Sequence, residues 1–396
     1  MAPTASQSIP DMELGNPYVG SISPNQERTQ NALFPFQPCD RTMQALYALA
    51  LQPIAETTAD SRSFGFRLFR SAQDASRYIF MCPGRKGSAP WILEGDIKGC
   101  FDNIAHDLLI ENIPMDRSIL TQFLKSGFIF DRNLYPTDKE TIQGRIISPI
   151  LANMTLDGIE KTLSARFPKM NIYFIRYADD VLVTSQTKEI AEKARSIIEE
   201  FLAERGLELS LDKSKITHID EGFDFLRYNF QKYKGKLRVK PSQKSIKAIC
   251  WKIKKLVLNA RAWAQDSLIQ VLNPVIRGWS NYHCHNAAKE TFVKLDHYVW
   301  TVTWQWGKYR HRNKGYKWIF RKYWHSEGNR NWVFQTKENT LLQFADATIR
   351  RHNIPKLQAN PYLDREYFLN RQESMKKQTP WIQTKLSFFA CRPLIG

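Results

Sequence analysis

The chain has 396 residues, of which 43% are hydrophobic and 24% charged, and its 57 Lys and Arg outnumber 39 Asp and Glu for a net charge of +18. This composition can bury a core, so it excludes a wholly disordered chain. No apolar run reaches the roughly 18 residues that cross a bilayer, and no secretory signal begins the chain, which predicts an intracellular protein outside the membrane. The six cysteines are far apart and form no CxxC pair, which indicates reduced thiols.

The positive charge is concentrated in residues 231–330. This window holds 22 Lys and Arg against 4 acidic residues, so its net charge is +18 and the rest of the chain is neutral in sum. It also holds eight of the eleven Trp. Because cations displace the counterions of phosphates, and aromatic rings stack on unpaired bases, this composition favours a nucleic-acid partner. The alternative is a basic helical bundle whose Trp residues form its core, and helical spacing of nearby apolar residues places most of them there.

The first half of the chain is predicted to alternate between helices and strands. Residues 1–39 show no periodicity and are predicted to be an irregular leader. Helices are predicted to begin at Asp40 and near Ser71, to cover residues 104–126, and to run from Ser148 or Pro149 through Leu163. A strand is predicted at residues 91–97, and a hairpin at residues 172–183.

The second half is predicted to change from mixed structure to helices. An amphipathic helix over residues 187–205 ends at Gly206, and short strands follow at residues 207–211, 223–230 and 237–239. Helices are predicted to dominate after Ser242. Together these elements predict an α+β domain followed by a helical one.

Three carboxylates could share a metal site. Asp96 ends the first predicted strand, and Asp179 and Asp180 lie at the turn of the hairpin, between apolar flanks. Three acids brought together would repel one another unless a hard divalent cation lay between them. Two such cations can activate a hydroxyl and stabilise a leaving pyrophosphate. The alternative for an isolated Asp-Asp pair is a solvated turn, and spacing alone does not decide between the two.

Longer motifs surround these acids. YADD at residues 177–180, DIKGCFDNIAHD at 96–107 and QGRIISPILAN at 143–153 resemble the reverse transcriptases encoded by group II introns. Further blocks resemble that family in the same order: SFGFRLFRSAQDA at 63–75, GLELSLDKSKITHI at 206–219, GFDFLRYNF at 222–230, RGWSNYH at 277–283, FVKLDHYVW at 292–300, KYRHRNKG at 308–315 and NRNWVF at 329–334. The resemblance runs from about Asp40 to about Arg371.

The resemblance implies an α+β, right-hand polymerase in which fingers and a palm with an antiparallel sheet precede a helical thumb, or maturase X domain. It implies that Asp96, Asp179 and Asp180 are catalytic and hold two Mg²⁺ ions, with Mn²⁺ as a substitute. It implies that Phe101 is the steric gate against the 2′-hydroxyl of ribonucleotides. A core phenylalanine is the alternative for Phe101.

The resemblance also suggests contacts to nucleotide and template. Gln143 and Gly144 match the block that lies against the incoming nucleotide and template, and Arg67 and Arg70 match basic residues of the fingers block. Lys213 matches a conserved lysine that could donate a proton to the leaving pyrophosphate, a contribution typically worth about 10²- to 10⁴-fold in rate. A solvated lysine is the alternative.

The chain departs from the family pattern at both ends and at several glycines. Its leader does not resemble the N-terminal fingers segment of the family, and residues 372–396 lack the Cys and His arrangement of an HNH endonuclease. Family glycines or prolines are replaced at Leu68, Phe69, Ile142, Arg145 and Arg227. Replacing Gly by Arg227 in the primer-grip turn would oppose a positive φ or crowd the primer.

These observations predict four regions: a leader at 1–39, fingers and palm at 40–230, a basic thumb at 231–371 and a tail at 372–396. The expected function is an RNA-directed DNA polymerase and intron maturase that binds group II intron RNA, an RNA template with a DNA primer or target DNA, and dNTPs. The expected location is the bacterial cytoplasm or an organelle's matrix or stroma, without a membrane partner. Two alternatives remain: an RNA-binding splicing cofactor or truncated relic without polymerase activity, and another palm-fold polymerase that copies RNA into RNA or acts in defence.

Overall fold

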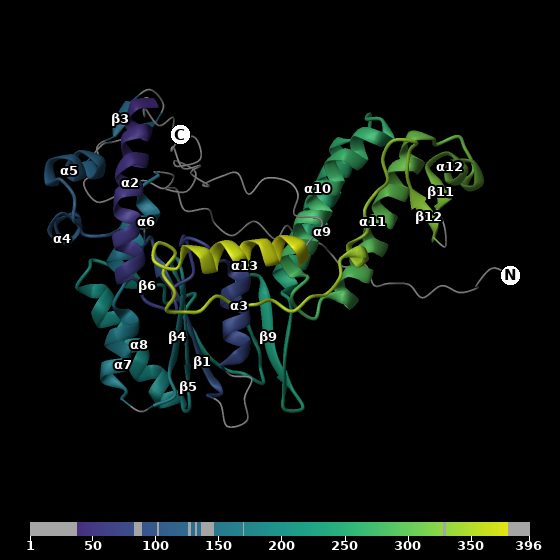
Figure 1. The fold of residues 1–396 in the computed structure, drawn as a ribbon. Helices are drawn as coiled ribbons and strands as arrows, with labels where there is room; N and C mark the ends of the chain where they lie inside the picture. The colour runs from purple at the N-terminus through teal and green to yellow at the C-terminus, as the bar shows by residue number, and fades with distance from the viewer. Residues whose placement is uncertain are drawn as a thin grey trace.

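The computed structural model describes residues 38–82, 89–100, 103–125, 128–130, 133–135, 146–168, 170–327 and 330–378. Two portions are visible in Figure 1, a mixed palm portion and a helical thumb, joined by a small sheet and by a C-terminal segment that runs back from the thumb to the palm. The predicted α+β class is confirmed.

The palm is built on an antiparallel sheet. Its strands follow the order β4-β5-β1-β6, and β7 also pairs with β1. The strands are β1 (Trp91–Lys98), β4 (Tyr173–Tyr177), β5 (Asp180–Ser185), β6 (Glu208–Leu209) and β7 (Lys215–His218). Both faces of the sheet are buried, because alternate side chains enter different cores: Leu93 and Val183 pack in one cluster, and Ile92 and Leu182 in another.

Helices cover both faces of this sheet. Helix α8 (Lys188–Ala203) packs against β1 and β5, and α3 (Ala72–Met81) packs against β4. The outer palm elements are α2 (Pro38–Thr58), α4 (His106–Asn112), α5 (Arg117–Lys125), β2 (Phe128–Phe130), β3 (Asn133–Tyr135), α6 (Ser148–Leu156) and α7 (Ile159–Arg166).

Two of the predicted palm helices are each divided in two. The chain breaks between α4 and α5 around Pro114, which lacks an N–H to continue a helix. It breaks again between α6 and α7, where Gly158 has a φ of +107°. The prediction of continuous helices here was wrong because local breakers outweighed the helical spacing.

A second sheet joins the palm to the thumb. Its order is β10-β9-β8, formed by β8 (Phe223–Phe225), β9 (Tyr228–Tyr233) and β10 (Lys236–Pro241). The expected boundary between residues 230 and 231 falls inside β9, because an antiparallel hairpin continues past it. The helical bundle begins at Gln243, and we keep the division into domains as a proposal.

The thumb is a helical bundle with a terminal hairpin. Its helices are α9 (Gln243–Asn259), α10 (Gln265–His283), α11 (Lys289–Arg310) and α12 (Tyr316–Tyr323), followed by β11 (Trp324–Glu327) and β12 (Arg330–Phe334). Trp306 and Trp324 are buried in its core, as the helical spacing predicted, whereas several other Trp are exposed. The hairpin was not predicted as such.

The C-terminal segment returns to the palm. After the short 3₁₀ helix η1 (Phe344–Asp346) the chain reaches α13 (Arg365–Gln378), which lies across the palm near α3 in Figure 1. The buried carboxylate of Asp74 accepts hydrogen bonds from Arg371 at 2.5 Å and from His352 at 2.8 Å. Phe368 stacks on Phe69 with ring centroids 5.2 Å apart. Helix α13 continues through the expected boundary at residue 371, and the remainder of the predicted tail lies outside the described residues. No helix in the described ranges is long and apolar enough to span a membrane.

Candidate active site

The register of the palm sheet brings together acids that are far apart in sequence. Asp96 on β1 lies directly opposite Asp180, the first residue of β5. Tyr177 pairs with Asp180, so Ala178 and Asp179 form a two-residue turn between β4 and β5. The Ile97 amide donates to the carbonyl of Asp179 at 3.1 Å, which fixes this turn beside β1. The hairpin predicted from the sequence is therefore present.

The three acids lie close enough together for the negative charge of one to affect the pKa of another. Burial, followed by the charges of Asp179 and Asp96, raises the pKa of Asp180 to about 7. Burial raises the pKa of Asp179 as well, with the charge of Asp96 adding to it. The Lys213 ammonium donates to Asp96 Oδ2 at 3.0 Å, and this hydrogen bond raises the pKa of Lys213. Such a site is stabilised by added positive charge.

The donor set suits a hard cation, but the side chains do not form a completed cage. All three groups offer carboxylate oxygens, the ligands that Mg²⁺ prefers. Within the described ranges no group of three or more His, Cys, Asp and Glu side chains is arranged to hold a metal as it stands. Lys213 instead supplies the neighbouring positive charge at Asp96. Binding of a cation would therefore need side-chain rotation on a backbone that already juxtaposes the acids.

The carboxylate turn rests on a glycine from a distant segment. A Cβ built on Gly65 would lie 2.2 Å from the backbone nitrogen of Ala178, far inside van der Waals contact. Ala178 has a φ of +56°, an uncommon conformation for a residue with a side chain. The Gly65 carbonyl accepts a hydrogen bond from the Asn153 side-chain amide at 3.0 Å. Only glycine permits this close approach.

A buried arginine holds the same network from behind. Arg176 is fully buried on β4 and donates to Asn153 Oδ1 at 2.8 Å and to Asp157 Oδ1 at 2.6 Å. Its backbone carbonyl accepts from the Phe64 amide at 2.8 Å. Roles for Gly65, Asn153 and Arg176 were not predicted, although each lies in or beside a recognised motif, because their contacts exist only in the folded chain.

The two arginines expected to contact nucleotide are engaged within the protein. Arg67 donates from Nε and Nη2 to Glu56 at 3.0 and 2.6 Å, and its side chain is 5% exposed. Arg70 donates to the carbonyls of Ser61 at 2.5 Å and of Leu357 at 2.8 Å, and burial followed by the charge of Arg67 lowers its pKa to about 10. This geometry gives both side chains structural contacts. Their nucleotide-binding role stays a prediction.

Three other expected site residues lie outside the described part of the chain. These are Phe101, Gln143 and Gly144. Their expected contacts to the nucleotide and template therefore stay predictions.

The primer-grip turn keeps its left-handed backbone without glycine. Phe225 pairs with Tyr228, so Leu226 and Arg227 form the turn between β8 and β9, with φ values of +48° and +66°. Two-residue hairpin turns commonly require such values at both positions. Arg227 therefore does not prevent a positive φ, contrary to one expectation for this position: the turn forms, and the Tyr282 hydroxyl donates to the Leu226 carbonyl at 2.8 Å. The other expectation, that Arg227 crowds the primer, stays a prediction.

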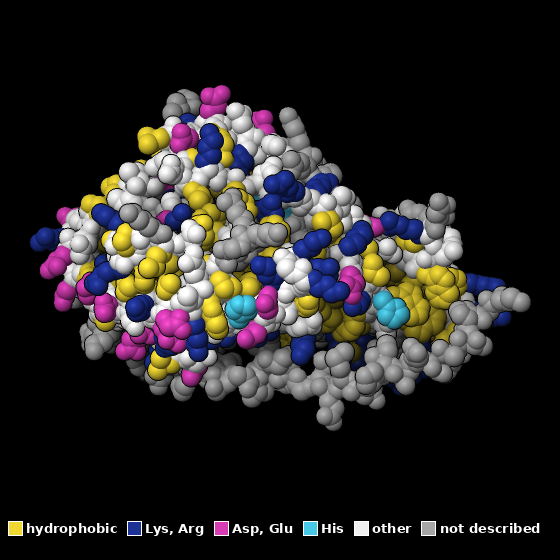
Figure 2. Space-filling model, turned by 90° about the horizontal axis from the view of Figure 1, so that it is seen from below, with side chains coloured by type: hydrophobic (Ala, Val, Ile, Leu, Met, Phe, Trp, Pro, Cys, Tyr) yellow, Lys and Arg dark blue, Asp and Glu magenta, His cyan; other side chains and the backbone are white. Residues whose placement is uncertain are grey.

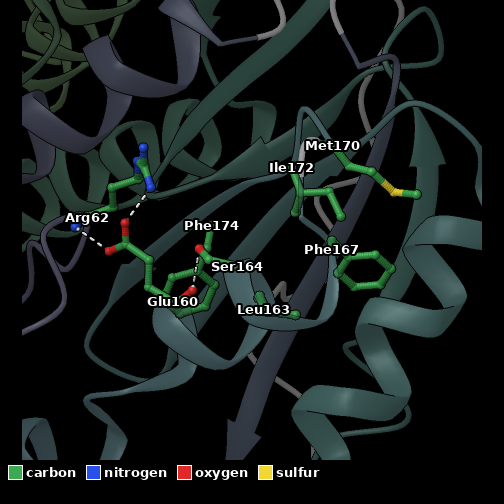
Figure 3. A pocket seen from close by; sticks show the side chains of 8 residues that line it. All are labelled: Arg62, Glu160, Leu163, Ser164, Phe167, Met170, Ile172 and Phe174. Atoms are coloured by element: carbon green, nitrogen blue, oxygen red, sulfur yellow. Dashed lines mark hydrogen bonds and ion pairs between the residues drawn. The ribbon is translucent and has the colours of Figure 1, made fainter.

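A separate cavity of about 200 Å³ lies beside α7 and β4. Figure 3 shows Arg62 paired with Glu160 at one side of it and Phe167, Met170 and Ile172 at the other. None of the three carboxylates lines this cavity. It has no geometric link to the candidate chemistry.

Comparison with known proteins identifies the two main portions. A model of the reverse transcriptase (RNA-dependent DNA polymerase) family matches residues 36–230, and a model of the group II intron maturase-specific domain matches residues 246–324. Together they cover about two thirds of the chain. The matches agree with the fold, in which the palm sheet precedes the helical bundle.

Individual proteins similar to this chain include proteins of bacteria and a solved telomerase structure. Protein YkfC of Escherichia coli (strain K12) is 29% identical over 54% of this chain and 70% of its own. The group II intron-encoded protein LtrA of Lactococcus lactis subsp. cremoris is 26% identical over 48% of this chain but 43% of its own, so the match spans less than half of LtrA. A telomerase from Candida albicans, solved with a fragment of telomeric RNA, has 14% identity and a TM-score of 0.37 over 71% of this chain and 53% of its own, too weak a likeness to support an argument. The family models confirm what the motifs predicted: the chain belongs to the reverse transcriptases that carry a group II intron maturase-specific domain.

Proposed function

We propose that this protein is an RNA-directed DNA polymerase and intron maturase. It extends a DNA primer or target DNA with dNTPs along an RNA template, and it binds group II intron RNA to assist splicing and mobility. The observation that carries the polymerase half is the pairing of Asp96 with Asp180 beside a turn that presents Asp179. This arrangement places three acids at one edge of the palm sheet.

We assign the metal ligands to these three acids. Asp96, Asp179 and Asp180 would hold two Mg²⁺ ions, or Mn²⁺, and when bound the ions supply activation of the primer hydroxyl and stabilisation of the leaving pyrophosphate. The raised pKa values of Asp179 and Asp180 support this assignment, since the crowded charges favour a bound cation. Lys213 lies near enough to exchange its contact with Asp96 for one with a phosphate oxygen.

The basic thumb supports RNA binding. The maturase-specific region overlaps the stretch that carries the net charge of +18, and Lys and Arg there would neutralise backbone phosphates. The group II intron-encoded relatives support the choice of intron RNA as the ligand. Affinity for RNA should therefore fall steeply as salt rises, with a slope that thumb Lys→Gln substitutions flatten.

One observation favours the alternative of an RNA-binding cofactor without synthesis. The side chains at the carboxylate site are not arranged as a metal cage, and Lys213 is bound to Asp96. Under this alternative the protein binds RNA but incorporates no dNTP.

Primer extension separates the two functions. Purified protein is given an RNA template, a DNA primer, dNTPs and Mg²⁺, and is compared with Asp179→Asn and with Asp107→Asn, a control at an exposed acid of the motif that contains Asp96. We expect extension by the wild type and by Asp107→Asn, and none by Asp179→Asn, while all three bind RNA equally. Absence of extension by the wild type with RNA binding intact would favour the cofactor. Incorporation of NTPs in preference to dNTPs would indicate an RNA polymerase.

A further inference from the structure

The end of the thumb farthest from the palm gathers exposed aromatic rings. Helix α9 has 17 residues and leads away from β10, so at 1.5 Å per residue the α9–α10 loop lies about 25 Å from the joining sheet. Arg310 Nη1 donates to the carbonyls of Arg261 at 2.9 Å and Trp263 at 2.7 Å, which ties this loop to the end of α11. We call residues 260–264 together with residues 308–322 the thumb cap.

The rings of the thumb cap are flanked by cations. Tyr309 is 44% exposed, and the guanidinium groups of Arg261 and Arg312 lie over its ring, 4.5 and 4.7 Å from the centroid. Trp318 is 40% exposed, and the ammonium groups of Lys314 and Lys322 lie 5.6 and 4.9 Å from its ring centroid. Each ring therefore has positive charge on its flanks and a large part of its surface open to solvent.

In the described part of the chain, these cations are not paired with acidic side chains. From His297 to Ser326 the sequence contains seven Lys and Arg and no Asp or Glu. Among the described residues, no cation of the thumb cap forms an ion pair with a carboxylate, in contrast to Arg67 and Arg176 in the palm. The surface thus carries uncompensated positive charge, which an anion would offset.

Stacked rings continue from the thumb cap along α11. Trp304 stacks with Tyr316 at 5.9 Å and 12°, and with Trp300 at 5.7 Å and 9°. The Lys308 ammonium lies 5.1 Å from the Tyr316 ring. Figure 2 shows a broad patch of hydrophobic side chains at the thumb end of the molecule, with Lys or Arg beside it. A hydrophobic protein partner would fit this patch but would leave the cations unpaired.

We propose that the thumb cap binds single-stranded RNA, with Tyr309 and Trp318 stacking on unpaired bases and the flanking cations contacting phosphates. An unpaired base can lie against the exposed part of each ring, whereas a base stacked inside a duplex cannot, and this distinguishes a single strand from a duplex. The choice of RNA over DNA rests on the proposed function. The binding mode does not, since it follows from the rings and charges alone.

The test compares ring and charge variants on three probes: a short RNA of A and C only, the same sequence as DNA, and an RNA duplex with the same number of phosphates. For the double variant Tyr309→Leu/Trp318→Leu we expect single-stranded RNA affinity to fall by about 10-fold or more, with duplex affinity unchanged. Arg312→Gln/Lys322→Gln should weaken all three and flatten the salt dependence. Tyr233→Leu is the matched control. Tyr233 is 47% exposed and has the Arg238 guanidinium over its ring, but it lies on the β9–β10 hairpin, outside the thumb cap.

All binding is measured without dNTPs and in an Asp179→Asn background, so that a failure of DNA synthesis does not affect the result. Thermal unfolding of each variant confirms that the exposed substitutions leave the fold intact. The proposal is overturned if the ring variant binds single-stranded RNA as the wild type does, or if it loses duplex and single-strand affinity equally. The choice of RNA as the ligand is overturned if the ring variant loses affinity for the DNA probe alone.

Discussion

The palm and the thumb each bring together charges of one sign, negative in the palm and positive in the thumb. They differ in how the surrounding residues hold those charges. In the palm, Asp96, Asp179 and Asp180 meet on a rigid sheet edge that is braced by Gly65 and Arg176. In the thumb cap, cations lie on helix ends and loops, and among the described residues none of them forms an ion pair with a carboxylate. Repulsion between like charges costs stability in both places. The difference agrees with our proposal of a metal ion in the palm and RNA on the thumb.

The largest expected effect comes from neutralising one palm carboxylate. Asp180→Asn should lower primer extension by about 10³-fold or more, because stabilisation by a bound cation is worth several kcal/mol. It should not change RNA affinity, which we assign to the thumb. Equal loss of extension and of RNA binding would contradict the division of function between the two regions.

The same substitution should stabilise the metal-free protein. Asp180 has a pKa raised to about 7, so between about pH 4 and 7 the folded state binds more protons than the unfolded state, and stability falls as pH rises through this window. In EDTA at pH 8 we expect the free energy of unfolding of Asp180→Asn to be about 1–2 kcal/mol higher than that of the wild type. This value is reduced for solvent screening. The difference should vanish near pH 4, as urea unfolding at the two pH values would show.

The next effect comes from replacing a glycine by alanine, once in the palm and once in the thumb. Gly65→Ala forces the carboxylate turn to move, since its Cβ would lie 2.2 Å from the Ala178 nitrogen, and a misplacement of about 1 Å can cost roughly 10²-fold in rate. Gly278→Ala on α10 is the control, because nothing lies within 4 Å of its new Cβ. It should stabilise the thumb by up to about 1 kcal/mol. The loss for Gly65→Ala should appear in kcat more than in KM for dNTP; a change in KM alone would contradict a positioning role.

The sequence indicated which residues could form the site, but not the contacts that support them. Acids between apolar flanks form a local pattern at Asp96 and at the YADD hairpin, and the family resemblance made that pattern a predicted metal site. Their pairing depends on the register of β1 with β5, which no local pattern contains. Gly65 and Asn153 were within recognised motifs, but the hydrogen bond between them joins residues that are 88 positions apart. For the same reason, the buried pairing of Arg67 with Glu56 could not be read from the fingers motif.

A third effect is the pH dependence of stability that His283, the last residue of α10, should cause. His283 is fully buried, contacts Ser245 Oγ at 3.2 Å and has a pKa lowered to about 3 by burial and then by the charge of Arg227. Between about pH 3 and 6.5 the folded state binds fewer protons than the unfolded state, so stability falls as pH decreases through this window. From pH 7 to 5 the loss should be about 2 kcal/mol. His283→Leu should remove this dependence, measured by urea unfolding with a thumb-specific Trp signal; an unchanged slope would assign the acid sensitivity to other groups.

The smallest expected effect is at the junction of the two regions. Arg227 holds a φ of +66°, which costs a non-glycine residue about 1–2 kcal/mol, whereas glycine loses roughly 0.5–1 kcal/mol more backbone entropy on folding. Arg227→Gly should therefore stabilise the protein by only about 0.5 kcal/mol. Because the Tyr282 hydroxyl holds this turn through the Leu226 carbonyl, Tyr282→Phe should loosen it, and Arg227→Gly should recover part of that loss. Thermal unfolding of the two single variants and the double variant measures this coupling, and strict additivity would show that the turn and the thumb are fixed independently.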